Sequence, residues 1–195
     1  MATPTDEELM LQVKQGDRAA FNALMDRYER PVMNLVYRYL QDYNIAEDLM
    51  QETFLKVYRA RERYEVRSKF STWLFQIAVN LCLNERRARS YRRHDSIEAM
   101  AGQEVPREVK DARGLDPNEA MQKRELAEKV RSAIQALPPD ERLMVILSKW
   151  EGKSYEEIAG IMNCSVDAVK SRLYRAKKLL RAHLKDFIEE IYETR

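Results

Sequence analysis

Between Pro31 and Gly102 the sequence contains neither proline nor glycine. These residues are the strongest local breakers of regular structure, so a long stretch without them favours long helices and speaks against the many turns of an all-β protein. The chain of 195 residues has only five glycines and six prolines, and 45% of its residues are hydrophobic, which is enough to form real cores. We therefore predict an all-α protein with one or two domains.

The amino-terminal part has the apolar spacing of several amphipathic helices. Thr5 and Glu8 form a capping box that opens the first helix. An apolar stripe over residues 21–39 is interrupted by Pro31, from which we expect two antiparallel helices. A further helix is predicted from about residue 46 to 61, followed by a polar loop. The outer face of this helix carries Glu47, Asp48, Gln51, Glu52 and Lys56.

Ser71 is placed to cap a helix that runs to about Tyr91, and this helix carries two stripes. One stripe is apolar and faces a core. The other combines an aromatic ring, three amides and a guanidinium at spacings of 3, 4, 4 and 3 residues: Trp73, Gln76, Asn80, Asn84 and Arg87. Amides read base edges, and flat rings stack on exposed bases, so this stripe suits nucleic acid. Trp73 and the nearby Phe70 could instead be core residues.

Residues 94–119 have no clear period and contain Gly102, Pro106, Gly114 and Pro117. We predict that they form a flexible linker, which joins two domains or follows the surface of a partner, because about 25 residues are too many for an ordinary connection inside one compact domain. After this linker, apolar spacing predicts a helix up to Leu137 and another that begins at Pro139 and turns Trp150 inward.

Near the carboxyl end we predict a short helix, a three-residue turn and a longer helix. Ser154 and Glu157 form a second capping box, and Ser165 caps the longer helix. This is the helix-turn-helix arrangement, whose second helix enters the major groove of DNA. The side chains expected at base edges and phosphates are Lys170, Ser171, Arg172, Tyr174, Arg175 and Lys178.

The positive charge is concentrated in two blocks, although Lys+Arg number 34 against 32 Asp+Glu overall. Residues 67–93 hold seven basic residues and one acid, and residues 168–185 hold seven and none. Residues 94–167 hold ten basic residues against fifteen acids. A basic helix face is often merely solvated, but two such blocks in an otherwise acidic chain make nucleic acid the leading partner.

Other classes of site have little support in the sequence. Cys82 and Cys164 lie far apart without CxxC or Cys/His spacing, so we expect no metal, no disulfide and no cofactor. The amino terminus is acidic and the longest apolar run is residues 143–147, so we expect no membrane insertion and a cytoplasmic location. No catalytic residue and no small-molecule substrate are predicted.

Four segments resemble a known family in sequence and in order. They are DLMQETFLKVYRA, KFSTWLFQIAVNLCLN, ALPPDERLMVIL and SYEEIAGIMNCSVDAVKSRLYRAKKLL. Together they look like bacterial RNA polymerase sigma factors of the extracytoplasmic-function class. The resemblance covers nearly the whole chain apart from the linker and implies a sigma-2 helical bundle over residues 1–93 and a sigma-4 domain over residues 120–195.

The resemblance also implies partners and roles. Core RNA polymerase would be contacted by Asp48, Gln51, Glu52 and Lys56. The single-stranded minus-10 element of a promoter would be opened and read by Tyr64, Lys69, Phe70, Trp73, Asn80, Asn84 and Arg87. The duplex minus-35 element would be read by the second helix of the helix-turn-helix. A further expected partner is an anti-sigma factor, which would hold a regulator of stress response inactive.

Two other functions are compatible with parts of the sequence. A stand-alone helix-turn-helix regulator would normally dimerise on a palindrome, but there is no heptad run, and the basic block at residues 67–93 would be unexplained. An enzyme acting on nucleic acid would need a phosphate-binding glycine loop or a cluster of metal ligands, and the sequence offers neither.

Overall fold

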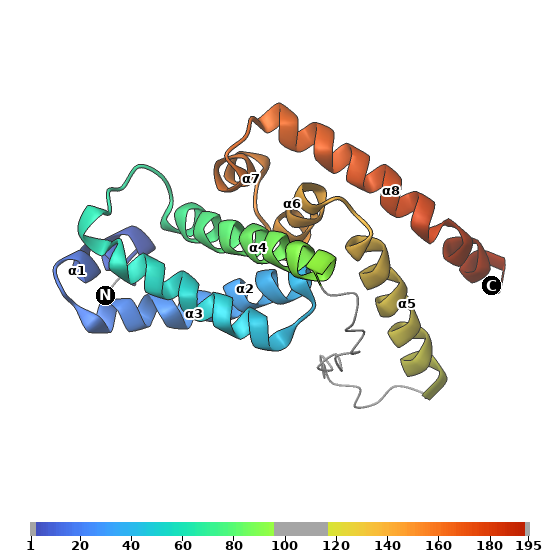
Figure 1. The fold of residues 1–195 in the computed structure, drawn as a ribbon, viewed down its shortest axis with the longest axis horizontal. Helices are drawn as coiled ribbons and strands as arrows, with labels where there is room; N and C mark the ends of the chain where they lie inside the picture. The colour runs from blue at the N-terminus through green and yellow to red at the C-terminus, as the bar shows by residue number, and fades with distance from the viewer. Residues whose placement is uncertain (1–2, 96–116, 194–195) are drawn as a thin grey trace.

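The computed structural model describes residues 3–95 and 117–193 of the chain, and within these ranges it is all-helical, which confirms the predicted fold class. The helices, which Figure 1 shows in chain order, are α1 (Asp6–Lys14), α2 (Arg18–Leu40), α3 (Tyr43–Arg59), the short 3-10 helix η1 (Arg61–Arg63), α4 (Phe70–Asp95), α5 (Pro117–Gln135), α6 (Pro139–Lys149), α7 (Tyr155–Met162) and α8 (Val166–Glu193). The predicted linker lies outside the described residues over 96–116, and at its two ends the chain is already helical.

The first four helices form a bundle in which α2, α3 and α4 pack on one another and α1 closes one end. Large apolar side chains fill its interior, among them Leu24, Leu35, Phe54, Leu74 and Phe75. The thiol of Cys82 is buried among them, and burial raises its pKa to about 12. Cys82 is therefore a small apolar core residue of α4, and the helices that pack around it support α4.

The prediction that Pro31 separates two helices is wrong, because α2 continues through it. A proline inside a helix removes one backbone hydrogen bond and costs about 3 kcal/mol. The buried side chains of α2 lie on both sides of it: Ala20, Leu24, Val32, Leu35, Val36 and Tyr39. Each large apolar side chain contributes about 1.5–3 kcal/mol on burial, so one continuous helix that buries them all outweighs the loss.

The helix-turn-helix of the second half is formed as predicted. The Ser154 hydroxyl accepts a hydrogen bond from the Glu157 amide, and the Glu157 carboxylate accepts one from the Ser154 amide. Residues 163–165 make the turn, in which Asn163 ends α7 with a left-handed backbone (φ 49°). The Ser165 hydroxyl then accepts from the Ala168 amide at 3.2 Å and fixes the direction in which α8 leaves.

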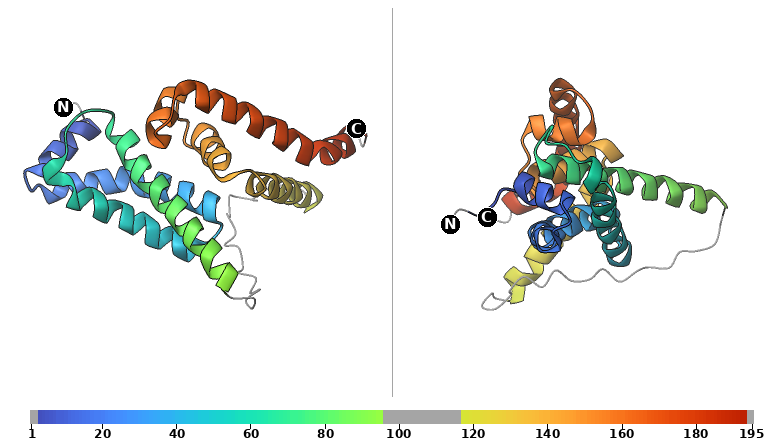
Figure 2. Two further views of the ribbon diagram at one scale, coloured as in Figure 1. Left: turned by 45° about the horizontal axis from the view of Figure 1, so that its top comes forward. Right: turned by 90° about the vertical axis from the view of Figure 1, so that its left-hand side faces the viewer.

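The two halves of the chain pack together along α4 (Figure 1). One cluster of buried apolar side chains runs from Phe75 and Val79 of α4 into Ile146 of α6 and Ile158 of α7. A β-carbon added at Gly160 of α7 would lie 3.0 Å from the Thr72 methyl group, which marks how closely α7 approaches α4. In both views of Figure 2 the carboxyl end of α4 projects beyond the helices that pack on it.

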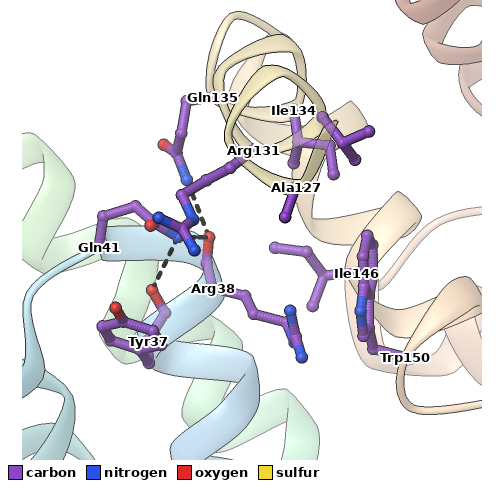
Figure 3. Close-up of a pocket in the computed structure, with 10 residues that line it drawn as sticks. Tyr37, Arg38, Gln41, Ala127, Arg131, Ile134, Gln135, Ile146 and Trp150 are labelled. Atoms are coloured by element: carbon purple, nitrogen blue, oxygen red, sulfur yellow. Dashed lines mark hydrogen bonds between the residues drawn. The ribbon is translucent and has the colours of Figure 1, made fainter. Parts of the chain in front are cut away.

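Trp150, which the sequence predicts to face inward, is instead 40% exposed at the boundary between the halves. The Arg38 guanidinium of α2 lies over its ring at 4.9 Å from the centroid (Figure 3). The Gln135 amide of α5 donates to the Arg38 carbonyl at 2.9 Å beside it. The periodicity of α6 could not predict this position, because the partner of Trp150 comes from another part of the chain.

Candidate nucleic-acid interface

Four of the six side chains predicted for duplex DNA lie on the exposed face of α8 and make no hydrogen bond or ion pair to another helix within the described residues: Lys170, Ser171, Tyr174 and Lys178. Tyr174 is 74% exposed, which is unusual for an aromatic side chain on a packed helix. Val169 and Ala176 are buried on the opposite side and hold α8 against its own domain. This geometry leaves one side of α8 free to enter a groove.

The other two predicted side chains of α8 turn toward the start of α6. The Arg172 guanidinium bonds the Asp140 carboxylate at 2.9 Å, and the Arg175 guanidinium lies 3.3 Å from the Glu141 carboxylate. Arg172 is half-buried whereas Arg175 remains exposed. Both arginines are therefore oriented by acids of their own domain, and phosphates or bases have to compete with these acids.

The polar stripe of α4 is solvent-accessible along its length, although its aromatic end is not fully so. Asn80, Asn84 and Arg87 are exposed, and the Asn84 amide oxygen accepts a hydrogen bond from Arg87 at 2.6 Å. Gln76 and Trp73 are half-buried. The stripe thus presents amide and guanidinium groups on the side of α4 that its core stripe does not use.

The aromatic residues predicted for the minus-10 element form a packed cluster. Tyr64 is 5% exposed and Phe70 is fully buried, with ring centroids 6.4 Å apart. Trp73 covers both, at 5.2 Å from Tyr64 and 6.0 Å from Phe70. Burial raises the pKa of the Tyr64 hydroxyl to about 12. In this conformation only Trp73 can offer part of a ring to a base, while Tyr64 and Phe70 support it from the core.

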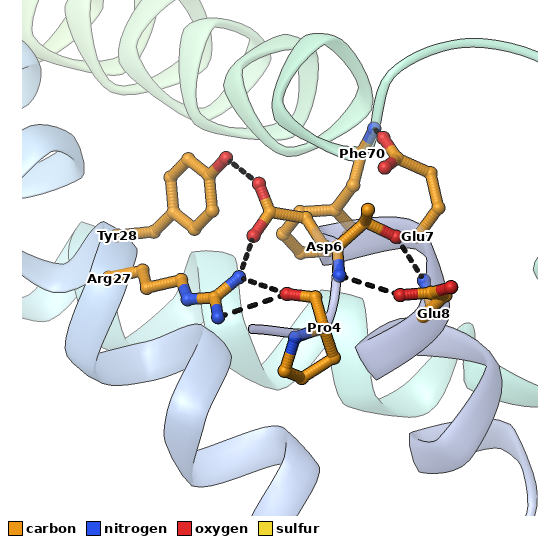
Figure 4. Close-up of polar contacts among 8 residues, drawn as sticks. Pro4, Asp6, Glu7, Glu8, Arg27, Tyr28 and Phe70 are labelled. Atoms are coloured by element: carbon orange, nitrogen blue, oxygen red, sulfur yellow. Dashed lines mark hydrogen bonds and ion pairs between the residues drawn. The ribbon is translucent and has the colours of Figure 1, made fainter. Parts of the chain in front are cut away.

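The start of α4 is held by the amino-terminal helix, as Figure 4 shows. The Glu7 carboxylate accepts a hydrogen bond from the Phe70 amide at 2.7 Å. The neighbouring Asp6 accepts from Arg27 at 2.6 Å and from the Tyr28 hydroxyl, and burial together with Asp6 raises the pKa of that hydroxyl. The prediction that Ser71 caps α4 is wrong, because the helix begins one residue earlier and the acceptor comes from α1.

Lys69, predicted for the minus-10 element, contacts the helix-turn-helix instead of solvent alone. Its ammonium group lies 2.9 Å from the Glu157 carboxylate of α7. The Ser154 amide and, next, Lys69 lower the pKa of Glu157, so this pair is ionised at neutral pH. The contact joins the start of α4 to the first helix of the helix-turn-helix.

The predicted polymerase-binding residues lie along α3. Asp48, Gln51 and Lys56 are exposed, while Glu52 is half-buried and pairs with Lys56 at 3.2 Å. Beside them a groove of about 700 Å³ runs between α2 and α3. Gln51 lines this groove together with apolar and aromatic side chains to which the sequence analysis gives no functional role: Phe21, Met25, Leu55 and Tyr58. In the sequence, the signal for this groove was Leu55, an apolar residue on the otherwise polar face of α3, whose side chain is 41% exposed.

In residues 3–95 and 117–193 there is no group of three or more His, Cys, Asp or Glu side chains that could hold a metal ion. No helix in these same ranges is long and apolar enough to span a bilayer.

Comparison with known proteins gives one consistent family. Residues 24–92 match the family described as sigma-70 region 2, and residues 127–180 match sigma-70 region 4. The RNA polymerase sigma-H factor of Pseudomonas aeruginosa is 35% identical over 191 residues, which cover 95% of this chain and 96% of the relative. The ECF RNA polymerase sigma-E factor of Escherichia coli is 37% identical over 177 residues, which cover 90% and 92%.

Solved structures agree with these relatives. The sigma factor RpoE of Bartonella quintana, in complex with the anti-sigma factor NepR, superimposes with a TM-score of 0.66 at 26% identity and covers 85% of this chain and 96% of its own. CnrH, in complex with the cytosolic domain of CnrY, shares the fold with a TM-score of 0.70 at 23% identity, covering 94% and 99%.

Proposed function

Because this chain belongs to the RNA polymerase sigma factors of the extracytoplasmic-function class, we propose that α4 and α8 read the minus-10 and minus-35 elements of one promoter. A sigma factor joins core RNA polymerase and directs it to promoters, and it is not an enzyme. It contributes binding free energy at defined DNA positions. The assignment of individual residues to these positions is our proposal.

We assign residues 1–93 to polymerase binding and minus-10 reading, residues 120–195 to minus-35 reading, and residues 94–119 to the connection between them. The two basic blocks support this division, since each half carries its own excess of positive charge. Two separate DNA-reading helices distinguish this chain from a stand-alone helix-turn-helix regulator, which needs only one such helix in each subunit.

Minus-35 reading is assigned to α8. Lys170, Ser171 and Tyr174 lie in its first turns, where a recognition helix contacts base edges, and Lys178 lies further along, where the phosphate backbone passes. Arg172 and Arg175 complete the set, because each can exchange its carboxylate, Asp140 or Glu141, for a phosphate ion pair or for hydrogen bonds to guanine. The net gain from these two arginines therefore depends on the DNA sequence.

Minus-10 reading requires that bases leave the duplex. Extruding a base costs a few kcal/mol, and stacking on an aromatic side chain returns about 1–3 kcal/mol per base. Trp73 provides such a platform, supported by Tyr64 and Phe70, and Asn80 and Asn84 provide amides for base edges. Lys69 and Arg87 at the two ends of this stripe supply charge for phosphates.

Polymerase binding is assigned to the exposed strip of α3 formed by Asp48, Gln51, Glu52 and Lys56. The groove beside Gln51 supports this assignment, because an interface needs apolar contact area as well as charge. Leu55 and Tyr58 supply that area within the same helix.

Promoter reading requires the two halves to separate. Helix and turn lengths place Asn80 of α4 and Tyr174 of α8, which lie near the middle of the two sets of reading residues, at most about 65 Å apart while Lys69 contacts Glu157. The minus-10 and minus-35 elements are named for positions about 25 base pairs apart, which is about 85 Å of duplex. The closed arrangement is therefore a resting state, and core polymerase binds the open one.

An anti-sigma factor is a further partner that we assign to this chain. The solved relative RpoE is bound to the anti-sigma factor NepR, and the present chain has the same family and a similar fold. A partner of this kind would cover the polymerase-binding and DNA-binding faces. We place the protein in the cytoplasm, where the polymerase and the promoters are, as a regulator of a stress response.

In vitro transcription from a fragment library of the source genome tests the proposed function. Purified core polymerase is used with and without the protein, and new start sites that share two spaced upstream elements are expected. Binding of the protein alone to discrete sites, without new starts, would favour the stand-alone regulator. The observation that carries the proposal is similarity at 35–37% identity over at least 90% of the chain, together with two DNA-reading helices.

A further inference from the structure

A second cleft lies between the two halves of the chain, away from the DNA-reading faces and from the groove on α3. It encloses about 510 Å³ where the end of α2, the second half of α4 and the start of α6 meet. Its polar lining comes from both halves: Tyr39, Arg86, Arg89, Ser90, Gln135 and Arg142. None of these residues is among those assigned to promoter or polymerase binding.

Three guanidinium groups line this cleft, and they are unequally neutralised. Arg89 bonds Asp42 at 2.8 Å and Glu85 at 3.1 Å. For Arg86 and Arg142 the described part of the chain provides no carboxylate within ion-pair distance. Because only Arg89 of the three has carboxylate partners among the described residues, the cleft has an excess of positive charge. Burial lowers the pKa of Arg142, Tyr39 acts against this shift, and the nearby charge of Arg86 adds to it.

Both buried, unpaired groups of the lining can donate a hydrogen bond. The Tyr39 hydroxyl and the Arg142 Nε are buried and have no partner among the described residues. The one strong side-chain acceptor, the Gln135 amide oxygen, already accepts from Arg142 at 2.6 Å. A buried donor left without an acceptor costs about 1–3 kcal/mol, so two of them beside unneutralised cations favour a ligand that brings acceptors and negative charge.

We propose that this cleft binds a small phosphorylated anion, with a diphosphate group placed between Arg86 and Arg142. Phosphate oxygens accept hydrogen bonds without donating any, which matches a lining of free donors, and guanidinium groups bind phosphate with charge-assisted bonds. The cleft is large enough for a diphosphate and too small for a folded partner. Because α4 and α6 both contribute, the bound anion holds the two halves in the closed arrangement.

Isothermal titration of the full chain with inorganic pyrophosphate, at constant ionic strength set with sodium chloride, tests the proposal. Saturable binding is expected, with an unfolding midpoint that rises with pyrophosphate concentration. Arg86→Ala should weaken binding about tenfold or more, the loss of one to two charge-assisted hydrogen bonds. Arg59→Ala is the control, since Arg59 is an exposed arginine of α3 that lies outside the cleft and has no assigned role in promoter or polymerase binding.

Tyr39→Phe gives a second variant that removes only the unpaired hydroxyl. It should weaken pyrophosphate binding several-fold without lowering the unfolding midpoint of the free protein, because no bond within the described chain is lost. Arg142 is unsuitable for this test, because its guanidinium also bonds the Leu137 carbonyl and thereby supports the fold.

Two ligand sources are separated by titrating a nucleoside diphosphate and a short single-stranded oligonucleotide in parallel. A nucleoside diphosphate that binds with the same dependence on Arg86 would identify a nucleotide as the source of the diphosphate. Binding of the oligonucleotide alone would overturn the proposal in favour of nucleic acid. Equal weakening in Arg86→Ala and Arg59→Ala, or no saturable binding at all, would reduce the cleft to general charge screening and overturn the proposal as well.

Discussion

Asn80 is an exposed amide at the middle of α4 and directly follows Ala78 and Val79, which are buried in the core. We expect Asn80→Ala to weaken minus-10 recognition by about tenfold, the value of one or two base-edge hydrogen bonds, without changing the thermal unfolding midpoint. Promoter opening by reconstituted holoenzyme measures the first effect and circular dichroism the second. Asn44→Ala, at an exposed asparagine of α3, is the control. A loss of helix content in Asn80→Ala would mean that Asn80 is a structural residue.

The Tyr64 hydroxyl is buried and has no hydrogen-bond partner among the described residues. Tyr64→Phe should therefore leave the free energy of unfolding unchanged or raise it by up to about 1 kcal/mol, since an unpaired polar group is removed. Phe70→Ala, in the same cluster, should cost about 3–5 kcal/mol. Urea unfolding measures both. Clear destabilisation by Tyr64→Phe would reveal a bound water or another partner at this hydroxyl.

At the scale of residues, the sequence predicts which side of a helix is polar better than it predicts how deep a side chain lies. The helical spacing of the polar stripe on α4 correctly predicted that Asn80, Asn84 and Arg87 are accessible. Tyr64 and Phe70 precede or begin the helix, where no periodicity applies, and their burial follows from packing against Tyr28 and Trp73. An aromatic residue at such a position is compatible with a core and with a base platform, and only the fold decides.

At the scale of elements, the start of α4 depends on Glu7, which lies 63 residues away in sequence. Glu7→Ala should destabilise the protein by about 0.5–2 kcal/mol, as loss of a helix amino-terminal cap does. Glu7→Gln keeps an oxygen acceptor and should recover most of this loss. Urea unfolding followed by far-ultraviolet circular dichroism gives both values, and equal destabilisation by the two substitutions would assign the effect to charge instead of capping.

Elements whose signals are local were predicted well, and those that depend on tertiary contacts were not. Both boundaries of the helix-turn-helix follow from Ser154, Glu157 and Ser165, which bond amides within their own first turns. Pro31 was misleading, because the cost of a proline is local whereas the burial that outweighs it comes from α3 and α4. The start of α4 was misplaced for the same reason.

At the scale of the whole molecule, Glu151 connects the closed arrangement to pH. Burial raises its pKa from 4.5 to about 7, although Lys153 and Arg38 of the other half act against this shift. The folded state then binds more protons than the unfolded state between these values, so stability decreases as pH rises from about 4.5 to 7. Glu151→Gln should remove this part of the pH dependence, and unfolding midpoints of both proteins at pH values across the window measure it. Parallel curves would mean that Glu151 titrates normally.

The close approach of α7 to α4 offers a way to open the molecule without touching a charged residue. A β-carbon at Gly160 would already lie 3.0 Å from the Thr72 methyl group, so the larger, branched side chain of Gly160→Val should push α7 away from α4. We expect a larger radius of gyration by small-angle scattering, with unchanged helix content.

If the closed arrangement is the resting state, Gly160→Val should also bind core polymerase more tightly. The apparent dissociation constant equals the intrinsic one divided by the fraction of open molecules, so its decrease measures how strongly the closed state is favoured. Thr72→Ala combined with Gly160→Ala is the matched control, because removing the methyl group makes room for the added β-carbon and should restore the closed dimensions. Expanded dimensions with unchanged polymerase affinity would mean that closure does not oppose binding, and the contact between Lys69 and Glu157 would then be a packing detail without a role in promoter selection.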